Sequence, residues 1–405
     1  MLTTPRDRFL LTTLTGSIMM VAALATDAML PAFPTMAEHF GIGDAAVQQV
    51  LTLFMFGYAL PHLLLGSLAD RFGRRPVLLA GLGVYGLGGA LCLFAPNFGW
   101  LLVGRFVQGM GAAAGPILAR AILRDLLHGA ELGRYLSFAM VVFTAGPVFG
   151  PSIGTLILTI AGWREIFIFL ALVGAALIFW VARGLPETLA TLDPQALDPR
   201  AVVSNAWIVL RHPQSGAMVL LLSLVYGSLV AYLGSSPGIF IGFFGVSEIT
   251  FALIFAIIAG LSFFSQAINA ALLKRFPPAR ILEVVLSFHL GVTLLMLWQS
   301  YADRASVLSL TINLAAFFVC FSFILANATA LAIDPHRARA GVASGLLGFL
   351  QILIGTLLGS LIGSFVAQGP TPLALGMSLI AAAILIVFFV TRRQFSLSAA
   401  VTVKG

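Results

Sequence analysis

Twelve long apolar stretches follow one another along the 405-residue chain, each about the length of a membrane span. A helix needs about 20 mostly apolar residues to cross a bilayer. Because the bilayer core offers no water to satisfy the backbone, such stretches fold as helices. The sequence therefore predicts an all-α membrane protein with twelve transmembrane helices, at residues 9–30, 45–68, 77–94, 100–123, 135–160, 165–182, 216–233, 247–272, 281–301, 305–331, 341–365 and 373–391.

The composition supports this class. Hydrophobic residues make up 60% of the chain and charged residues only 9%, against roughly 25% charged residues in a soluble domain. A net charge of +7 in a soluble protein would suggest nucleic acid. In a membrane chain, lysine and arginine instead mark cytoplasmic loops. We therefore expect the lipid bilayer as a partner and no nucleic acid.

The basic residues also orient the chain. If the N-terminus is cytoplasmic, nearly all of the 22 lysines and arginines lie in cytoplasmic loops or at inner helix ends. Arg164 and Arg304 then lie outside, and Arg105 lies within a span. The opposite orientation would reverse this bias. We expect a multi-pass protein of the bacterial cytoplasmic (inner) membrane with both termini in the cytoplasm.

The longest polar connection, residues 184–215, divides the spans six and six. We expect an N-terminal bundle at 1–183, a cytoplasmic interdomain loop at 184–215 and a C-terminal bundle at 216–405. The halves echo each other, since "DRFGRRPVLL" after the second span resembles "KRFPPARILE" after the eighth. The glycine spacing of the fifth span also recurs in the eleventh. The sequence thus predicts two pseudo-symmetric six-helix bundles.

The stretch "GSLADRFGRRP", residues 66–76, concentrates charge between the second and third spans. Asp70 can accept hydrogen bonds from a helix N-terminus or pair with an arginine, and Gly73 permits a tight reversal. We expect these contacts to form a conformational latch that holds while the inner surface is closed. The alternative is that the arginines only fix topology. The latch residues would be Gly66, Asp70, Arg71, Gly73, Arg74 and Arg75.

Two charged residues lie inside spans. Asp27 is about 28 Å from Arg8 along a helix, and Arg105 follows the outer end of the fourth span. Their matching depth predicts an ion pair in the outer half of the membrane. A buried carboxylate facing a guanidinium can exchange a proton when the two separate. The alternatives are a static salt bridge, or an Asp27 side chain that reaches the outer interface near Pro31.

The fifth span contains "AGPVFGPSIGTL". Gly146, Gly150 and Gly154 share one helix face and allow close backbone approach. Pro147 and Pro151 remove two backbone donors and favour a kink. The pattern predicts a bendable, leak-tight seam with the eleventh span. Ordinary small-residue packing is the alternative.

Several of these motifs resemble those of a known family. The loop at 66–76 resembles the signature of the major facilitator superfamily, and "TDAMLPAFP" and "GRFVQGMGAA" resemble signatures of its Bcr/CflA drug-resistance transporters. The likeness covers nearly the whole chain. It implies proton-coupling roles for Asp27 and Arg105, with Gln108 completing the second signature, and it likens the fifth span to an antiporter motif. The chain departs at Pro61-His62, where many relatives carry Gly-Gln. His62 is a second proton site or a packing residue.

The same resemblance implies a substrate cavity between the two bundles. Polar and aromatic residues in its lining suit small amphipathic molecules. The candidate contacts are Tyr58, Gln108, Phe143, Tyr226, Asn313, Asn327 and Gln351.

We expect a proton-coupled antiporter that exports small amphipathic compounds resembling chloramphenicol or bicyclomycin. A metabolite or siderophore exporter and a proton symporter are alternatives within the fold, and a membrane enzyme or receptor is an alternative outside it. The chain has no Walker A motif and no metal-type cluster of histidine, cysteine and carboxylate. We expect a monomer without cofactors, driven by the proton gradient.

Overall fold

A computed structural model describes residues 5–402, and these residues contain helices but no β-strand. Eleven helices within them are long and apolar enough to cross a membrane, and one bent pair of helices makes a twelfth span. The predicted twelve-helix membrane fold is confirmed. The ends of the chain, predicted to face the cytoplasm, lie outside the described residues.

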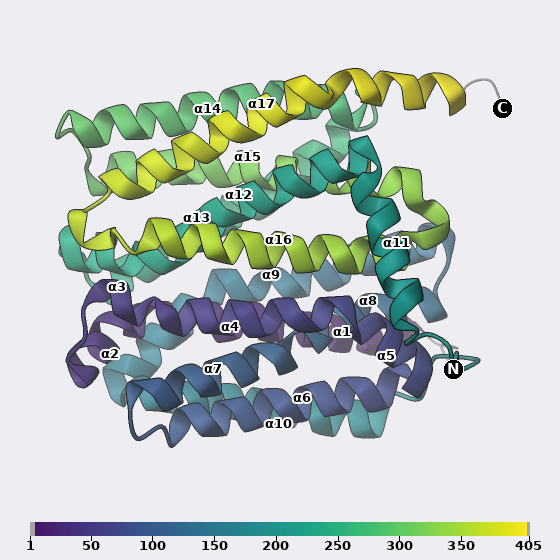
Figure 1. Cartoon of the computed structure of the whole chain (residues 1–405). Helices are drawn as coiled ribbons and strands as arrows, with labels where there is room; N and C mark the ends of the chain where they lie inside the picture. Colours follow the sequence, from purple (N-terminus) through teal and green to yellow (C-terminus); the bar gives the residue numbers. More distant parts are fainter. Residues whose placement is uncertain (1–4, 403–405) are drawn as a thin grey trace. The chain divides into compact units, whose positions relative to one another are not determined.

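Contacts divide the chain into two compact units, one up to Pro199 and one from Arg200 onward. The helices of the first unit run back and forth beside one another (Figure 1). They are α1 (Pro5–Asp27), η1 (Leu30–Ala32), α2 (Phe33–Phe40), α3 (Asp44–Val47), α4 (Gln49–Ala59), η2 (Leu60–Leu63), α5 (Leu65–Phe72), α6 (Arg74–Leu93), α7 (Phe98–Ala112), α8 (Ala114–Leu126), α9 (Gly129–Ile160) and α10 (Trp163–Gly184).

The second unit begins inside the connection predicted at 184–215, part of which is helical. It contains α11 (Pro199–Arg211), α12 (Pro213–Pro237), η3 (Gly238–Phe243), α13 (Glu248–Leu272), α14 (Pro278–Tyr301), α15 (Val307–Ile333), η4 (Asp334–Arg339), α16 (Ala340–Gly363), η5 (Val366–Gln368) and α17 (Thr371–Thr402).

The two units repeat one packing pattern. In the first unit α1 packs on α9 and α8, α4 packs on α7, and α6 packs on α7 and α10. In the second unit α12 packs on α16 and α15, α13 packs on α15, and α14 packs on α15 and α17. Each of these helix contacts of the first unit thus has a counterpart between the equivalent spans of the second unit. The predicted pseudo-symmetry is confirmed.

Prolines break the first two spans. Pro31 has no N–H to donate to the carbonyl of Asp27, four residues earlier, and α1 ends at Asp27. Pro61 likewise leaves the carbonyl of Gly57 without its helical donor. There α4 gives way to η2, and the axis bends by 50° before α5. By contrast, α9 continues through Pro147 and Pro151 without a break in the helix, although these prolines favoured a kink.

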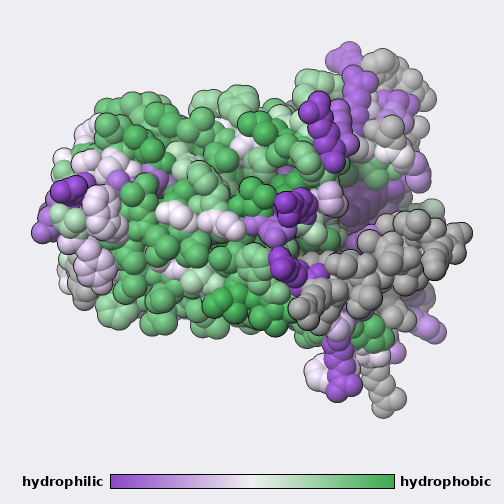
Figure 2. All heavy atoms as spheres, turned by 90° about the horizontal axis from the view of Figure 1, so that it is seen from above, coloured by the Kyte–Doolittle hydropathy of each residue, from purple (hydrophilic) through white to green (hydrophobic). Residues whose placement is uncertain are grey.

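Apolar side chains cover the sides of the helices. Leu156, Phe264 and Val390 are exposed by 61%, 70% and 74%. Figure 2 shows a hydrophobic belt on one face, with hydrophilic residues gathered at its two ends. An exposed apolar surface of this extent needs lipid rather than water around it.

Candidate functional site

A column of stacked side chains runs along one face of α4 and its continuation η2. The guanidinium of Arg105 lies 4.4 Å from the ring centre of Phe54. Phe54 stacks on Tyr58 at 6.3 Å, and Tyr58 meets the ring of His62 edge-on at 4.9 Å. Phe54, Tyr58 and His62 are spaced four residues apart and therefore share one face of the helix. Arg105 packs on Phe54 at the start of this column. Three residues of the predicted site, Arg105, Tyr58 and His62, thus lie close together.

Arg105 on α7 connects three helices. Its Nη1 donates to the carbonyl of Ala25 on α1 at 3.2 Å and to Oε1 of Gln108 at 2.7 Å. Its Nε donates to the carbonyl of Val50 on α4 at 3.2 Å. The side chain is only 1% exposed. Arg105 therefore holds the backbone of α1 two residues before Asp27.

Asp27 is 4% exposed and is the last residue of α1. Among the described residues it forms no ion pair with Arg105, so the predicted pair is wrong for this structure. The physical reason is that the guanidinium is directed to backbone carbonyls and to Gln108. Asp27 instead lies against α9. A Cβ built on Gly150 would come within 2.9 Å of the Cβ of Asp27.

The glycines of α9 face α1. A Cβ on Gly146 would meet Met20 at 3.0 Å, and a Cβ on Gly154 would collide with the backbone carbonyl of Ala28. These glycines therefore serve packing of α9 on α1 within the first unit, and the seam with the eleventh span stays a prediction. The second unit repeats the arrangement, since Gly359 on α16 leaves room for Val230 on α12.

His62 lies at the bend produced by Pro61. Its Nδ1 is 2.8 Å from the carbonyl oxygen of Tyr58. Because a carbonyl oxygen only accepts, Nδ1 carries the proton of this hydrogen bond. Nε2 is left to interact with something else. The role of His62 as a second proton site stays a prediction.

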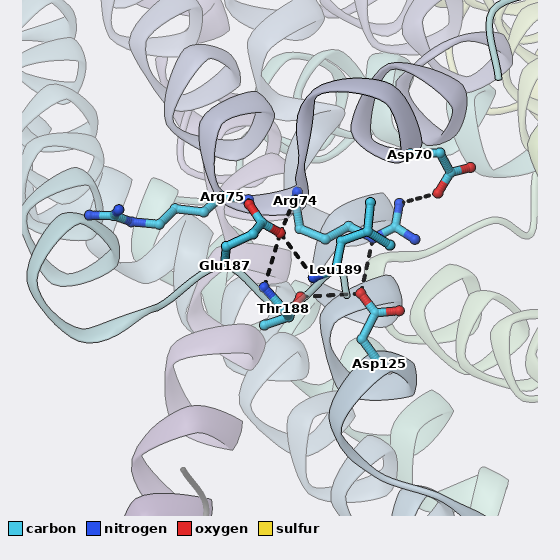
Figure 3. A network of polar contacts seen from close by, with 7 residues as sticks. All are labelled: Asp70, Arg74, Arg75, Asp125, Glu187, Thr188 and Leu189. Carbon is cyan, nitrogen blue, oxygen red and sulfur yellow. Dashed lines mark hydrogen bonds and ion pairs between the residues drawn. The ribbon is translucent and has the colours of Figure 1, made fainter. Parts of the chain in front are cut away.

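The charged loop at 66–76 forms a compact network at one end of the first unit, here named the basic end (Figure 3). Arg74 pairs with Asp70 at 2.6 Å, and its Nε pairs with Asp125 of α8 at 3.0 Å. Gly73 has a φ of 96°, which L side chains rarely adopt. The predicted ion pair of Asp70 and the tight reversal at Gly73 are both present.

Glu187, which follows α10, binds the N-terminus of α6. Its carboxylate accepts hydrogen bonds from the backbone N–H groups of Arg74 and Arg75 at 2.9 and 3.1 Å. It also accepts from the N–H groups of Thr188 and Leu189 at 2.9 and 3.0 Å. Partial burial opposes ionisation, but these four donors outweigh it and hold the pKa of the Glu187 carboxyl below its ordinary value.

The remaining latch residues take no part in the ion pairs. Arg71 is exposed and lies 5.4 Å from the ring centre of Phe72. A Cβ on Gly66 would meet no atom within 4 Å. The guanidinium of Arg75 donates to the carbonyl of Ala182 at 2.7 Å. All of these contacts join parts of the first unit, so opening and closing of the latch stays a prediction.

Loss of the Glu187 charge should weaken this network. We expect Glu187→Gln to melt a few degrees below the wild type at neutral pH. Because the folded pKa is depressed, this contribution is fully present above the ordinary carboxyl pKa of about 4.3. It disappears as the pH falls through the lowered folded value. Thermal melts of both proteins between neutral and acidic pH measure the difference.

The control is Glu38→Gln, the same change at an exposed carboxylate of α2. It should melt like the wild type at every pH. A Glu187→Gln protein that matches the wild type at neutral pH would show that the four hydrogen bonds contribute nothing to stability.

Two predicted substrate contacts instead join helices of the second unit. The amide of Asn313 donates to Oε1 of Gln299 on α14 at 2.7 Å. The amide of Asn327 donates to Oδ1 of Asn269 on α13 at 2.8 Å. Polar side chains within a bilayer commonly bond across helices in this way.

For three other predicted contacts, the structure shows the helix on which each residue lies and how it is packed. Phe143 lies half-buried on α9, and Gln351 is buried on α16. Tyr226 lies on α12, where a Cβ on Gly355 would come within 2.8 Å of its ring. The substrate roles of all seven residues stay predictions.

Sequence reasoning missed three polar residues. Asp125 and Glu187 complete the network at the basic end, but each stands far from residues 66–76 in the sequence. Arg120, assigned to an inner helix end, lies in the middle of α8 with its charge acting on Tyr58 and His62. The sequence did signal that Arg120 lies within the span, because it stands six residues before the end of an apolar helix.

Two repeated six-helix units, a hydrophobic belt and charged residues buried within spans define a polytopic membrane transporter. The family comparison agrees, since the model of the Major Facilitator Superfamily matches residues 15–353. The chain belongs to this family, and it is a transporter rather than an enzyme.

Two relatives show which members of the family this chain resembles. The chain is 28% identical to multidrug resistance protein D of Escherichia coli, with 82% of both chains covered. It is 26% identical to a bicyclomycin resistance protein homolog of Haemophilus influenzae, with 94% of this chain and 95% of the relative covered. The predicted likeness to Bcr/CflA drug-resistance transporters is confirmed.

A solved structure shows the same fold. The human organic anion transporter MFSD10 is 17% identical and superposes with a TM-score of 0.72, covering 95% of this chain and 100% of that one.

Proposed function

We propose that the chain is a proton-coupled antiporter that exports small amphipathic compounds, among them chloramphenicol- and bicyclomycin-like drugs. The names of its relatives, a multidrug resistance protein and a bicyclomycin resistance protein homolog, support drug efflux. The structural observation that supports proton coupling is Asp27, a carboxylate buried where the first span breaks.

The surroundings of Asp27 suit a proton-exchange site. A carboxylate within a span is costly while it is charged, and binding a proton removes that cost. Arg105 fixes the backbone just before Asp27 at Ala25. Gly150 and Gly154 allow α9 to approach Asp27 and Ala28 at the backbone. Loading and unloading of the proton would therefore act directly on the packing of α1 against α9.

The remaining features follow from this proposal. By the positive-inside rule, the basic end and both termini would face the cytoplasm. The protein would act as a monomer in the bacterial inner membrane, and it would need no cofactor because the proton gradient drives export. The network of Arg74 with Asp70 and Asp125 would open and close with each cycle.

Accumulation of chloramphenicol in a host that lacks its own efflux pumps tests this function. We expect expression of the chain to lower the intracellular drug several-fold relative to an empty vector. A protonophore, which collapses the proton gradient, should restore accumulation. Unchanged accumulation, or efflux that survives the protonophore, would refute proton-driven export of this class of compound.

A further inference from the structure

Arg120 is a charged residue that neither the latch nor the proton site uses. It lies in the middle of α8 with an exposed side chain. It forms no hydrogen bond or ion pair with the residues that the structure describes. A charged residue within a span normally faces a partner or a water-filled cavity, because exposure to lipid is costly. Arg120 therefore faces either water or an anionic partner that is not among the described residues.

The position of Arg120 follows from the network at the basic end. There Arg74 connects Asp70 of α5 with Asp125 of α8, and these two helices pack together. Arg120 precedes Asp125 by five residues, about 7.5 Å further along α8. His62 precedes Asp70 by eight residues, beyond the bend in the second span. Arg120 and His62 therefore both lie deeper in the membrane than the ion pairs of Arg74 at the basic end.

Electrostatics agrees with this placement. The charge of Arg120 acts on both Tyr58 and His62. Asp70 of α5 and Asp125 of α8 itself share Arg74, and Glu131 of α9 pairs with Arg8. Asp27 lies near the level of Arg105, fifteen residues before Arg120. The positive charge at this level is thus left uncompensated.

The neighbours of Arg120 supply the rest of a binding site. A guanidinium presents paired N–H donors that match a carboxylate. The Nε2 of His62 is left as an acceptor for a hydroxyl or amide group of the ligand, since Nδ1–H donates to the Tyr58 carbonyl. The rings of Phe54 and Tyr58 continue the column and offer a flat apolar surface. Together these groups suit a molecule with an anionic head and an aromatic body.

We propose that Arg120 and the hydroxyl group of Tyr58 bind the carboxylate of an amphipathic exported compound, and that Nε2 of His62 accepts a hydrogen bond from an uncharged polar group of the same compound. This assignment of substrate class rests on the proposed export function. It adds a charged group to the polar and aromatic contacts that the sequence predicts for the pocket. Anionic compounds would be preferred over neutral compounds of the same shape.

Chloramphenicol and chloramphenicol succinate test this preference, because the second compound adds a free carboxylate to the first. Calorimetric titration of the purified chain in detergent should show about tenfold tighter binding of the succinate, or roughly 1.4 kcal/mol. Arg120→Gln should bind the two compounds equally, and Arg120→Lys should keep part of the preference. Arg124→Gln removes a neighbouring exposed arginine from the last turn of α8 and should keep most of it.

Two results would overturn the assignment: a wild type that does not prefer the succinate, and a preference that survives Arg120→Gln. If Arg120 instead meets a lipid phosphate, adding phosphatidylglycerol should stabilise the wild type but not Arg120→Gln. The preference for the succinate would then not depend on Arg120, which again contradicts the proposal. Failure of the export function is distinguishable, since it would leave the binding preference intact without substrate-driven proton flux.

Discussion

Arg105→Leu is expected to lower the free energy of unfolding by about 3 kcal/mol. The substitution leaves the carbonyls of Ala25 and Val50 and the amide oxygen of Gln108 without their donor. An interhelical hydrogen bond in a membrane contributes only about 0.6 kcal/mol on average. Three hydrogen bonds at this average give about 1.8 kcal/mol. The contact of the guanidinium with Phe54 adds about 1 kcal/mol, which brings the expected loss to about 3 kcal/mol.

Unfolding in mixed micelles, followed by circular dichroism, measures this loss. Arg105→Lys keeps the charge but not the forked set of donors, so it should restore only part of the stability. Arg124→Leu makes the same change at an exposed arginine and should unfold like the wild type. An Arg105→Leu protein as stable as the wild type would show that the three-helix junction is not held by this side chain.

Much of the fold could be predicted from apolar length alone. Each span is a run that only a bilayer accommodates, and loops such as residues 66–76 separate the runs. Proline positions were a poorer guide. A kink was predicted at Pro147 and Pro151, where α9 continues without a break, whereas no break was predicted at Pro61, which interrupts the second span.

The site was predicted less completely, because a sequence gives the depth of a residue but not its direction around the helix. Asp27 and Arg105 share a depth, yet the guanidinium is directed to the carbonyls of Ala25 and Val50. Asn313 shows the same difficulty, since a mid-span amide suits a neighbouring helix as well as a substrate.

Contacts of the connecting segments were also beyond sequence reasoning. Glu187 stands in a loop without hydrophobic periodicity, and its partners lie more than 110 residues earlier. Only the folded first unit brings its carboxylate to the N-terminus of α6. The need for such a cap could be inferred from the free N–H groups at any helix start, but the residue that supplies it could not.

Asp27→Asn is expected to abolish proton exchange while leaving the fold intact. The amide has nearly the same shape as the carboxyl group, so α1 should still pack against Gly150 and Gly154. It does not take up and release a proton in the accessible pH range. Substrate binding should survive, because Arg120, Tyr58 and His62 lie nearer the basic end. Asp27→Glu keeps the exchangeable proton and should retain part of the activity.

Proton flux into liposomes containing the purified chain and an internal pH-sensitive dye tests this most directly. With the wild type, an imposed chloramphenicol gradient should drive protons in the opposite direction. With Asp27→Asn, the dye signal should match that of empty liposomes, although circular dichroism shows the same helix content. Proton counterflow through Asp27→Asn at the rate of the wild type, or chloramphenicol movement through the wild type without protons, would contradict the account.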